Sequence, residues 1–213
     1  MRSWSFMASA AIAIAQMVPC GSAHAQGAEI PVPKGPAKCT LGGWTNNAIG
    51  EGIVVRAAPA VTARSLGRLP TGAADYEYSV TFRIIGARNG WLKITGASDD
   101  YNVNEGKPVR PIYRGTGWIP ADSARFAVQS QHGYDRADAE GNLVMKLDDW
   151  PRIERVLSCD GEWALLDVDI GPREEIDSAT LAEQVRTGRG WFRGVCAIEE
   201  TTCDMPSVDD RKR

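Results

Sequence analysis

The chain has 213 residues, which is enough for one domain of ordinary size or two small ones. Its composition is that of a globular protein and excludes a collagen-like, coiled-coil or low-complexity architecture. Its formal net charge of −3 argues against general nucleic-acid binding and against a polybasic membrane-surface protein, since both require a basic excess.

Residues 1–25 have the pattern of a signal peptide. Arg2 supplies the positive start, and residues 6–18 form an apolar core that is too short to span a bilayer comfortably. The sequence Ala-His-Ala at 23–25 has small residues where a signal peptidase cleaves, so we expect the mature chain to begin at Gln26. Loss of Arg2 takes the net charge from −3 to −4. An uncleaved anchor is the alternative.

The cysteine pattern indicates an oxidising compartment. Signal cleavage removes Cys20, whose preceding Pro19 makes a poor lipidation signal, although a lipoprotein stays the alternative. Four cysteines remain in the mature chain: Cys39, Cys159, Cys196 and Cys203. An even number in an exported chain predicts two disulfides, with three possible pairings. We favour Cys196–Cys203 together with Cys39–Cys159, while a zinc site is the rival and lacks a C-x-x-C pair.

Both ends of the mature chain differ in composition from its middle. Residues 26–38 are rich in Pro and Gly and predict an extended linker with no core of its own. Residues 206–213 are a charged tail, which we expect to fray.

Between these ends, short apolar runs alternate with turn residues, a pattern typical of strands. In the first half the expected strands are 52–55, 82–85, 91–94 and 117–119. The Asn-Gly pair at 89–90 predicts a tight hairpin, since both residues tolerate positive φ. In the second half the expected strands are 143–147, 155–158, 163–168 and 190–192, with a matching turn at 159–162.

The spacing of four tryptophans indicates an internal repeat. Trp91 and Trp118 lie 27 residues apart, and Trp163 and Trp191 lie 28 apart. The offset between copies is therefore 72 residues for the first pair and 73 for the second. Each copy carries an insertion between its two tryptophan strands, where loop length costs little stability. The second insertion predicts one short helix that Asp177 or Ser178 caps and Gly188 ends.

The first half resembles the bacterial SH3-like (SH3b) family. The resemblance lies in "GIVVRAAPAVTARSLGRLPTG", "NGWLKI" and "GTGWIPADSARF", which follow one another in the family's order over residues 52–128. The second half is similar in "DGEWALLDV" and "GRGWFRGVC" but has "YDRADAE" in place of the V-R-x-x-P signature. Its C-terminal part also resembles exported SH3-domain proteins of Gram-negative bacteria.

This resemblance implies an all-β protein of two tandem SH3-like small β-barrels. The first barrel covers residues 39–128, and a second, degenerate one covers 129–205. A barrel of this size has a small core, so disulfides and contact between the barrels are expected to stabilise it.

Few residues offer catalytic chemistry, and we expect no enzyme, no metal and no cofactor. The mature chain has one histidine, His132, which we interpret as a solvated linker residue. The adjacent carboxylate pairs fall in turns, insertions or the tail and read as solvated loops. Glycine-rich stretches lack the strand–loop–helix context and the lysine of a phosphate loop.

The resemblance instead implies a groove that holds an extended peptide between aromatic side chains. The candidate groove residues are Tyr76, Tyr78, Trp91, Pro120 and Trp163. Ser123 stands where eukaryotic SH3 domains place an aromatic residue, which argues against polyproline binding. We expect a periplasmic or secreted, non-catalytic module whose partner is a peptidoglycan peptide or an envelope protein. The alternative is a structural platform in an envelope complex.

Overall fold

The computed structural model describes residues 30–71, 80–99, 106, 108–147, 152–170, 187–196 and 209. It confirms the all-β class, because almost every described element is a strand. In the first half these elements are β1 (Ala37–Thr45), β2 (Ile53–Arg56), β3 (Ser65–Leu69), β4 (Thr81–Arg88), β5 (Trp91–Asp99), β6 (Arg110–Pro120), the 3-10 helix η2 (Ala121–Ser123) and β7 (Ala124–Arg125). In the second half they are β8 (Ala127–Val128), β9 (His132–Tyr134), β10 (Leu143–Lys146), β11 (Arg152–Asp160), β12 (Trp163–Asp169), β13 (Thr187–Phe192) and β14 (Val195–Cys196).

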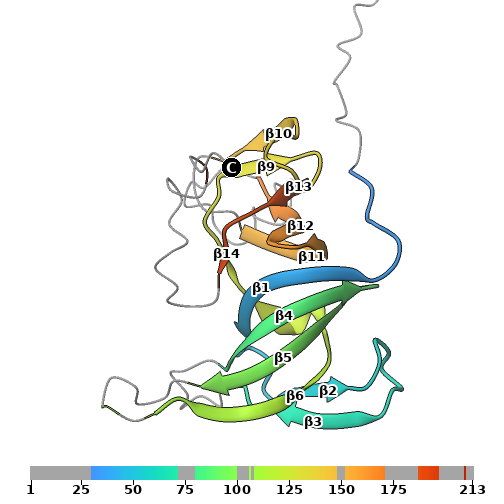
Figure 1. Cartoon of the computed structure of the whole chain (residues 1–213), viewed down its shortest axis with the longest axis vertical. Helices are drawn as coiled ribbons and strands as arrows, with labels where there is room; N and C mark the ends of the chain where they lie inside the picture. Colours follow the sequence, from blue (N-terminus) through green and yellow to red (C-terminus); the bar gives the residue numbers. More distant parts are fainter. Residues whose placement is uncertain are drawn as a thin grey trace, which may run out of the picture.

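The first half forms one curled, antiparallel sheet with the order β3-β2-β6-β5-β4-β1-β7 (Figure 1). Its centre is the meander β4–β5–β6, in which buried and more exposed side chains alternate along β5. Asn89 and Gly90 join β4 to β5 with φ values of 50° and 76°, as a tight hairpin requires. After β6, the turn η2 carries the chain back so that β7 pairs with β1.

The second half repeats this strand order. Its sheet runs β10-β9-β13-β12-β11, which matches β3-β2-β6-β5-β4 element by element. The short strands β8 and β14 pair with each other, as β1 and β7 do in the first half. The two halves meet where β1 of the first half lies beside β11 of the second (Figure 1).

The register of the two meanders is also the same. Trp91 pairs with Arg88, and Trp163 pairs with Asp160. On the other side, Trp118 pairs with Lys93 and with Arg56 of β2. Trp191 likewise pairs with Leu165 and with Tyr134 of β9. The tryptophans that the sequence aligned therefore occupy equivalent places in the two sheets.

A glycine occupies the equivalent position in both sheets, in the last strand of the meander (β6 or β13) beside its neighbouring hairpin strand (β2 or β9). A Cβ at Gly117 would collide with a methyl group of Val55 and lie 3.1 Å from the main-chain carbonyl oxygen of Arg56, both in β2. At the equivalent Gly190, a Cβ would lie 3.1 Å from the Cα of Gly133 in β9. At both positions the neighbouring main chain approaches so closely that only glycine fits without a shift.

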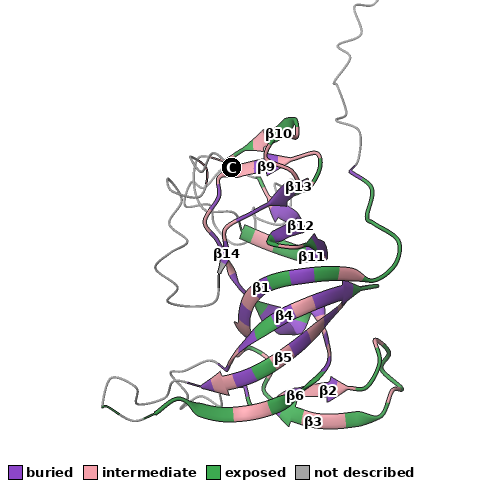
Figure 2. Ribbon diagram, in the orientation of Figure 1, coloured by how far each residue is buried: buried purple, intermediate pink, exposed green. Residues whose placement is uncertain are grey.

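One core joins the two halves. Buried side chains from both sheets, among them Ile84, Ile119, Val156, Leu166 and Phe192, form a single hydrophobic cluster. Figure 2 shows buried residues on β1 and β4 and on the neighbouring strands β11 and β12. The Gly161 N–H donates to the Lys38 carbonyl at 2.9 Å, and the Thr40 N–H donates to the Gly161 carbonyl at 2.7 Å.

The predicted disulfide between Cys39 and Cys159 is confirmed, with 5.5 Å between the two Cα atoms. It joins β1 to β11 beside the main-chain hydrogen bonds of Gly161, and both cysteines belong to the common core. The other predicted pair is not described, because Cys203 and the side chain of Cys196 lie outside the described residues. The main chain of Cys196 pairs with Ala127 of β8.

Several boundaries differ from the sequence predictions. β5 and β6 extend into the first insertion, and an ion pair of 2.9 Å between Asp99 and Arg110 links their ends. Gly188, the predicted helix end, lies instead in β13, while the rest of the predicted helix lies outside the described residues. Main-chain pairing with β12 explains this, since it extends β13 back to Thr187.

Two residues of the expected linkers take part in the structure of the second half. Ile30, in the expected linker 26–38, is buried against Trp163, Leu165 and Trp191, and the Arg189 guanidinium donates to its carbonyl at 3.2 Å. His132, expected to be a solvated linker residue, begins β9 and is half-buried. Ile30 is buried because the second sheet supplies an apolar surface that the local sequence does not reveal.

Candidate functional site

Two of the predicted groove residues come together at the end of the first meander. The Asn89–Gly90 turn makes Trp91 the first residue of β5, where it pairs with Pro120 at the end of β6. Paired residues of antiparallel strands direct their side chains to the same face. The Ala121 N–H donates to the Gly90 carbonyl at 2.9 Å and holds η2 against the turn.

Trp91 and Pro120 line a cavity of about 760 Å³. Its apolar lining includes Val32, Ile49, Val61, Trp91, Pro120 and Leu157. Val61 is 70 % exposed and Val32 is 41 % exposed, so apolar side chains stand open to solvent at its edge. An apolar concave site with a few polar groups is what an extended ligand requires.

The walls of this groove come from both halves. One wall is the 89–90 turn with η2, and the facing wall is β11 from Arg155 to Ser158. The segment before β1 contributes Val32 and Pro33. The site therefore exists only because the second sheet packs beside the first.

The groove continues along η2 into a second cavity of about 490 Å³. The residues that line both cavities are Ile49, Ala121, Asp122, Arg155 and Val156. Charged side chains stand along the larger cavity: Arg88 and Arg155 are cationic and Asp122 is anionic. The two cavities together suit an extended peptide that lies over apolar residues and carries an acidic group.

Trp163 does not belong to this groove, which corrects the sequence prediction. It is only 3 % exposed and packs in a second small core with Ile30, Leu165 and Trp191. The Tyr134 ring meets its ring edge to face, with 5.5 Å between centroids. Trp91 and Trp163 are equivalent in register, but the second sheet covers its tryptophan with β9 residues. Tyr76 and Tyr78 lie outside the described residues.

Sequence reasoning missed the second wall of the groove. Arg155, Val156 and Leu157 carry no motif, and their strand reads as an ordinary member of the second sheet. The signal that points to them is the Cys39–Cys159 bridge, which brings β11 beside β1. Pro33 was assigned to a linker, although its apolar neighbours were visible in the sequence.

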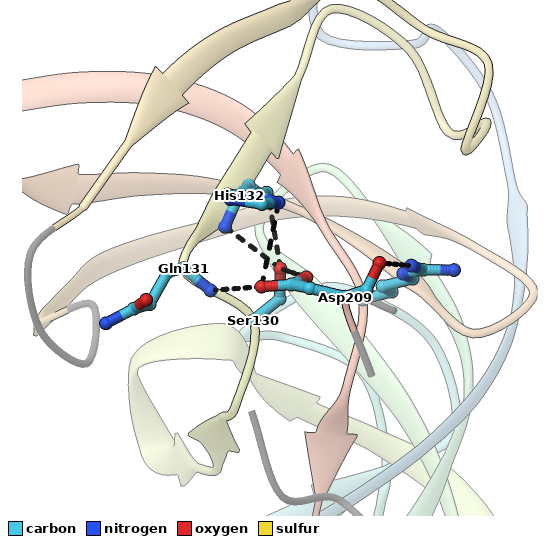
Figure 3. A network of polar contacts seen from close by, with 5 residues as sticks. Ser130, Gln131, His132 and Asp209 are labelled. Atoms are coloured by element: carbon cyan, nitrogen blue, oxygen red, sulfur yellow. Dashed lines mark hydrogen bonds and ion pairs between the residues drawn. The ribbon is translucent and has the colours of Figure 1, made fainter. Parts of the chain in front are cut away.

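A serine, a histidine and an aspartate also meet in the second half, but not as a hydrolase triad. Asp209 accepts a hydrogen bond from the Ser130 hydroxyl at 2.5 Å and lies 3.7 Å from the His132 Nδ1 (Figure 3). Ser130 is fully buried, and its hydroxyl also bonds the main chain of His132. A hydrolase requires the imidazole to receive the proton of an accessible serine, whereas here the carboxylate stands next to the hydroxyl.

No protein-family model matches the chain, and no curated protein or solved structure matches it either. Over the described part of the chain, no cluster of three or more histidine, cysteine or acidic side chains is arranged to hold a metal ion. No helix in that part of the chain combines the length and apolar character needed to cross a membrane.

Proposed function

We propose that this protein is a non-catalytic binding module that holds an extended peptide in the groove between its two sheets. The observation that carries the proposal is the pairing of Trp91 with Pro120 in an open apolar cavity. An extended peptide gains affinity from side chains that enter such a groove, and aromatic anchors supply much of that affinity.

We further propose that the two halves are tandem SH3-like barrels. The strand order supports this, because each half has a three-stranded meander, a hairpin paired with its last strand, and a closing strand paired with an opening one. In the first half, the segment "GTGWIPADSARF", which is similar to the family's closing strand and short helical turn, forms the end of β6, the turn η2 and β7.

The ligand that we propose is a cell-wall peptide or an envelope protein segment in the periplasm. The signal-like residues 1–25 and the Cys39–Cys159 disulfide support an oxidising, extracytoplasmic compartment. Arg88 and Arg155 beside the cavity favour a peptide that bears carboxylates, which charge-assisted hydrogen bonds hold well.

The second candidate function is a rigid platform within an envelope complex. The common core of the two sheets and the bridge between them favour it, since they prevent the halves from moving as separate domains. A platform would use the groove as part of a wider protein interface and would have no affinity for isolated peptidoglycan.

Co-sedimentation with peptidoglycan sacculi separates these candidates. The mature protein is expected to pellet with sacculi, whereas Trp91→Ala weakens binding about tenfold or more, since anchor truncation costs about 2 kcal/mol. Trp118→Ala is the matched control, because Trp118 is equally half-buried but does not line the groove.

Wild-type behaviour of Trp118→Ala would show that the loss is specific to the groove. If the unmodified protein stays in the supernatant, the cell-wall ligand is rejected and the platform is favoured. Equal losses in both variants would reject the groove as the binding site.

A further inference from the structure

A second candidate site lies in the second half, where a carboxylate of the C-terminal tail accepts hydrogen bonds from residues near β9. Ser130 and Gln131 lie on the segment that joins β8 to β9, His132 begins β9, and Arg193 directly follows β13. Asp209 comes from the C-terminal tail, 79 residues after Ser130. Figure 3 shows the Asp209 carboxylate directed at Ser130, Gln131 and His132.

Both oxygens of this carboxylate have donors. The Ser130 hydroxyl donates to Oδ1 at 2.5 Å, and the Gln131 N–H donates to Oδ2 at 3.1 Å. The His132 Nδ1 lies 3.7 Å from Oδ2, and the Arg193 guanidinium donates to the Asp209 carbonyl at 3.1 Å. A hydroxyl, a main-chain amide, an imidazole and a guanidinium around one position are groups that recognise a carboxylate and its adjoining carbonyl.

Contacts within the second half also hold these donors in place. Ser130 is fully buried, and the main-chain N–H of His132 donates to its Oγ at 3.0 Å. The same hydroxyl lies 3.1 Å from the His132 carbonyl, to which it can donate in the absence of a carboxylate. Arg193 is 5 % exposed and lies over the Trp163 ring, with its Cζ 5.8 Å from the ring centroid.

Two buried donors at this place have no partner among the described residues: the Arg193 Nε and the Trp163 Nε1. Within the same part of the chain, no carboxylate forms an ion pair with Arg193, although a buried cation is costly without one. Burial raises the pKa of the nearby Tyr134 phenol, while Arg193 lowers it and the negative charges of Asp209 and Glu140 raise it further. The Arg193 Nε therefore stands as a buried donor without an acceptor among the described residues.

We propose that Ser130, the Gln131 N–H, His132 and Arg193 form a carboxylate-binding site, which Asp209 occupies as an internal ligand. The chemical class that it recognises is a carboxylate with an adjoining carbonyl group, as at the end of a peptide. This site is separate from the groove at Trp91 and does not rest on the function proposed for that groove.

The test is chemical rescue of the mature chain with acetate, measured as the melting temperature at constant ionic strength. Asp209→Ala is expected to melt about 3–8 °C below wild type, because it removes the carboxylate that accepts from the Ser130 hydroxyl and the Gln131 N–H. Sodium acetate is expected to restore at least half of this loss with a saturable dependence, and sodium chloride is not. Asp210→Ala removes the same charge from the next residue and is expected to melt like wild type without an acetate response.

Two further variants locate the effect. Asp209→Asn fills the same space with an amide, so it should lose stability but gain nothing from acetate. Adding Ser130→Ala to Asp209→Ala removes a donor to the carboxylate and should raise the acetate concentration for half-maximal rescue about tenfold. A short peptide with a free C-terminal carboxylate should stabilise Asp209→Ala, and its C-terminal amide should not.

The proposal is overturned if Asp209→Ala melts at the temperature of Asp210→Ala, or if acetate shifts both variants equally. It is also overturned if the peptide amide protects Asp209→Ala as well as the acid does. Failure of Trp91→Ala to change sacculus binding would leave these outcomes untouched, so the two sites are tested separately.

Discussion

Replacing both Cys39 and Cys159 by serine is expected to lower the free energy of unfolding by about 3–5 kcal/mol. The two residues lie 120 positions apart, so the bridge closes a long loop and removes much of the entropy of the unfolded chain. Urea denaturation of the double variant and of the oxidised wild type measures the difference.

The matched control is the double variant Cys196→Ser, Cys203→Ser, which removes the other two cysteines of the mature chain. These cysteines lie only seven positions apart, so even a complete bridge between them is expected to contribute less, about 2–3 kcal/mol. Equal losses in the two double variants would contradict the role that we assign to the bridge between β1 and β11.

Phe192→Ala is expected to cost about 3–5 kcal/mol. Its ring is fully buried and lies against Gly133 and Gly190, where a Cβ would come within 2.9 and 3.2 Å of ring carbons. Neighbouring backbones cannot collapse into the space that the ring leaves, so the cavity stays open. Thermal unfolding monitored by circular dichroism measures the loss.

Ile119 is the register equivalent of Phe192 in the first half and is also fully buried in the common core. Ile119→Ala is expected to cost about 2–5 kcal/mol and to shift the same unfolding transition as Phe192→Ala. A single transition follows from one core that both halves share. Two transitions, each sensitive to only one variant, would show that the halves fold independently.

The repeat of the strand meander could be predicted from the sequence, because the spacing of the four tryptophans reflects their equivalent places in the two sheets. The offsets of 72 and 73 residues hold for both strand pairings of the meander, from Trp91 and Trp163 to Trp118 and Trp191. The Asn89–Gly90 turn was predictable because positive φ restricts the residues that can occupy it.

The contacts between the halves were harder to predict, because they depend on surfaces that form only after each sheet folds. Nothing local to Ile30 marks it as buried, and its partners Trp163 and Trp191 follow more than 130 residues later. The same holds for Trp163, whose sequence context matches that of Trp91 although Tyr134 covers its ring.

One part of the candidate site could be predicted from the sequence and the other could not. Trp91 and Pro120 were predictable as a pair, since they flank one hairpin of a recognisable motif. The β11 wall depends on the packing of two sheets, for which the cysteine pair was the only clue in the sequence. The Asp209 site joins segments whose charges and polar groups look like an ordinary loop and tail.

Indole N–H signals in a two-dimensional NMR spectrum test directly whether the groove at Trp91 binds peptide. We predict that soluble peptidoglycan peptides shift the Trp91 signal saturably and leave that of Trp118, which lies outside the groove, in place. A Trp91 signal that does not shift at high peptide concentrations would show that these peptides do not bind in the groove.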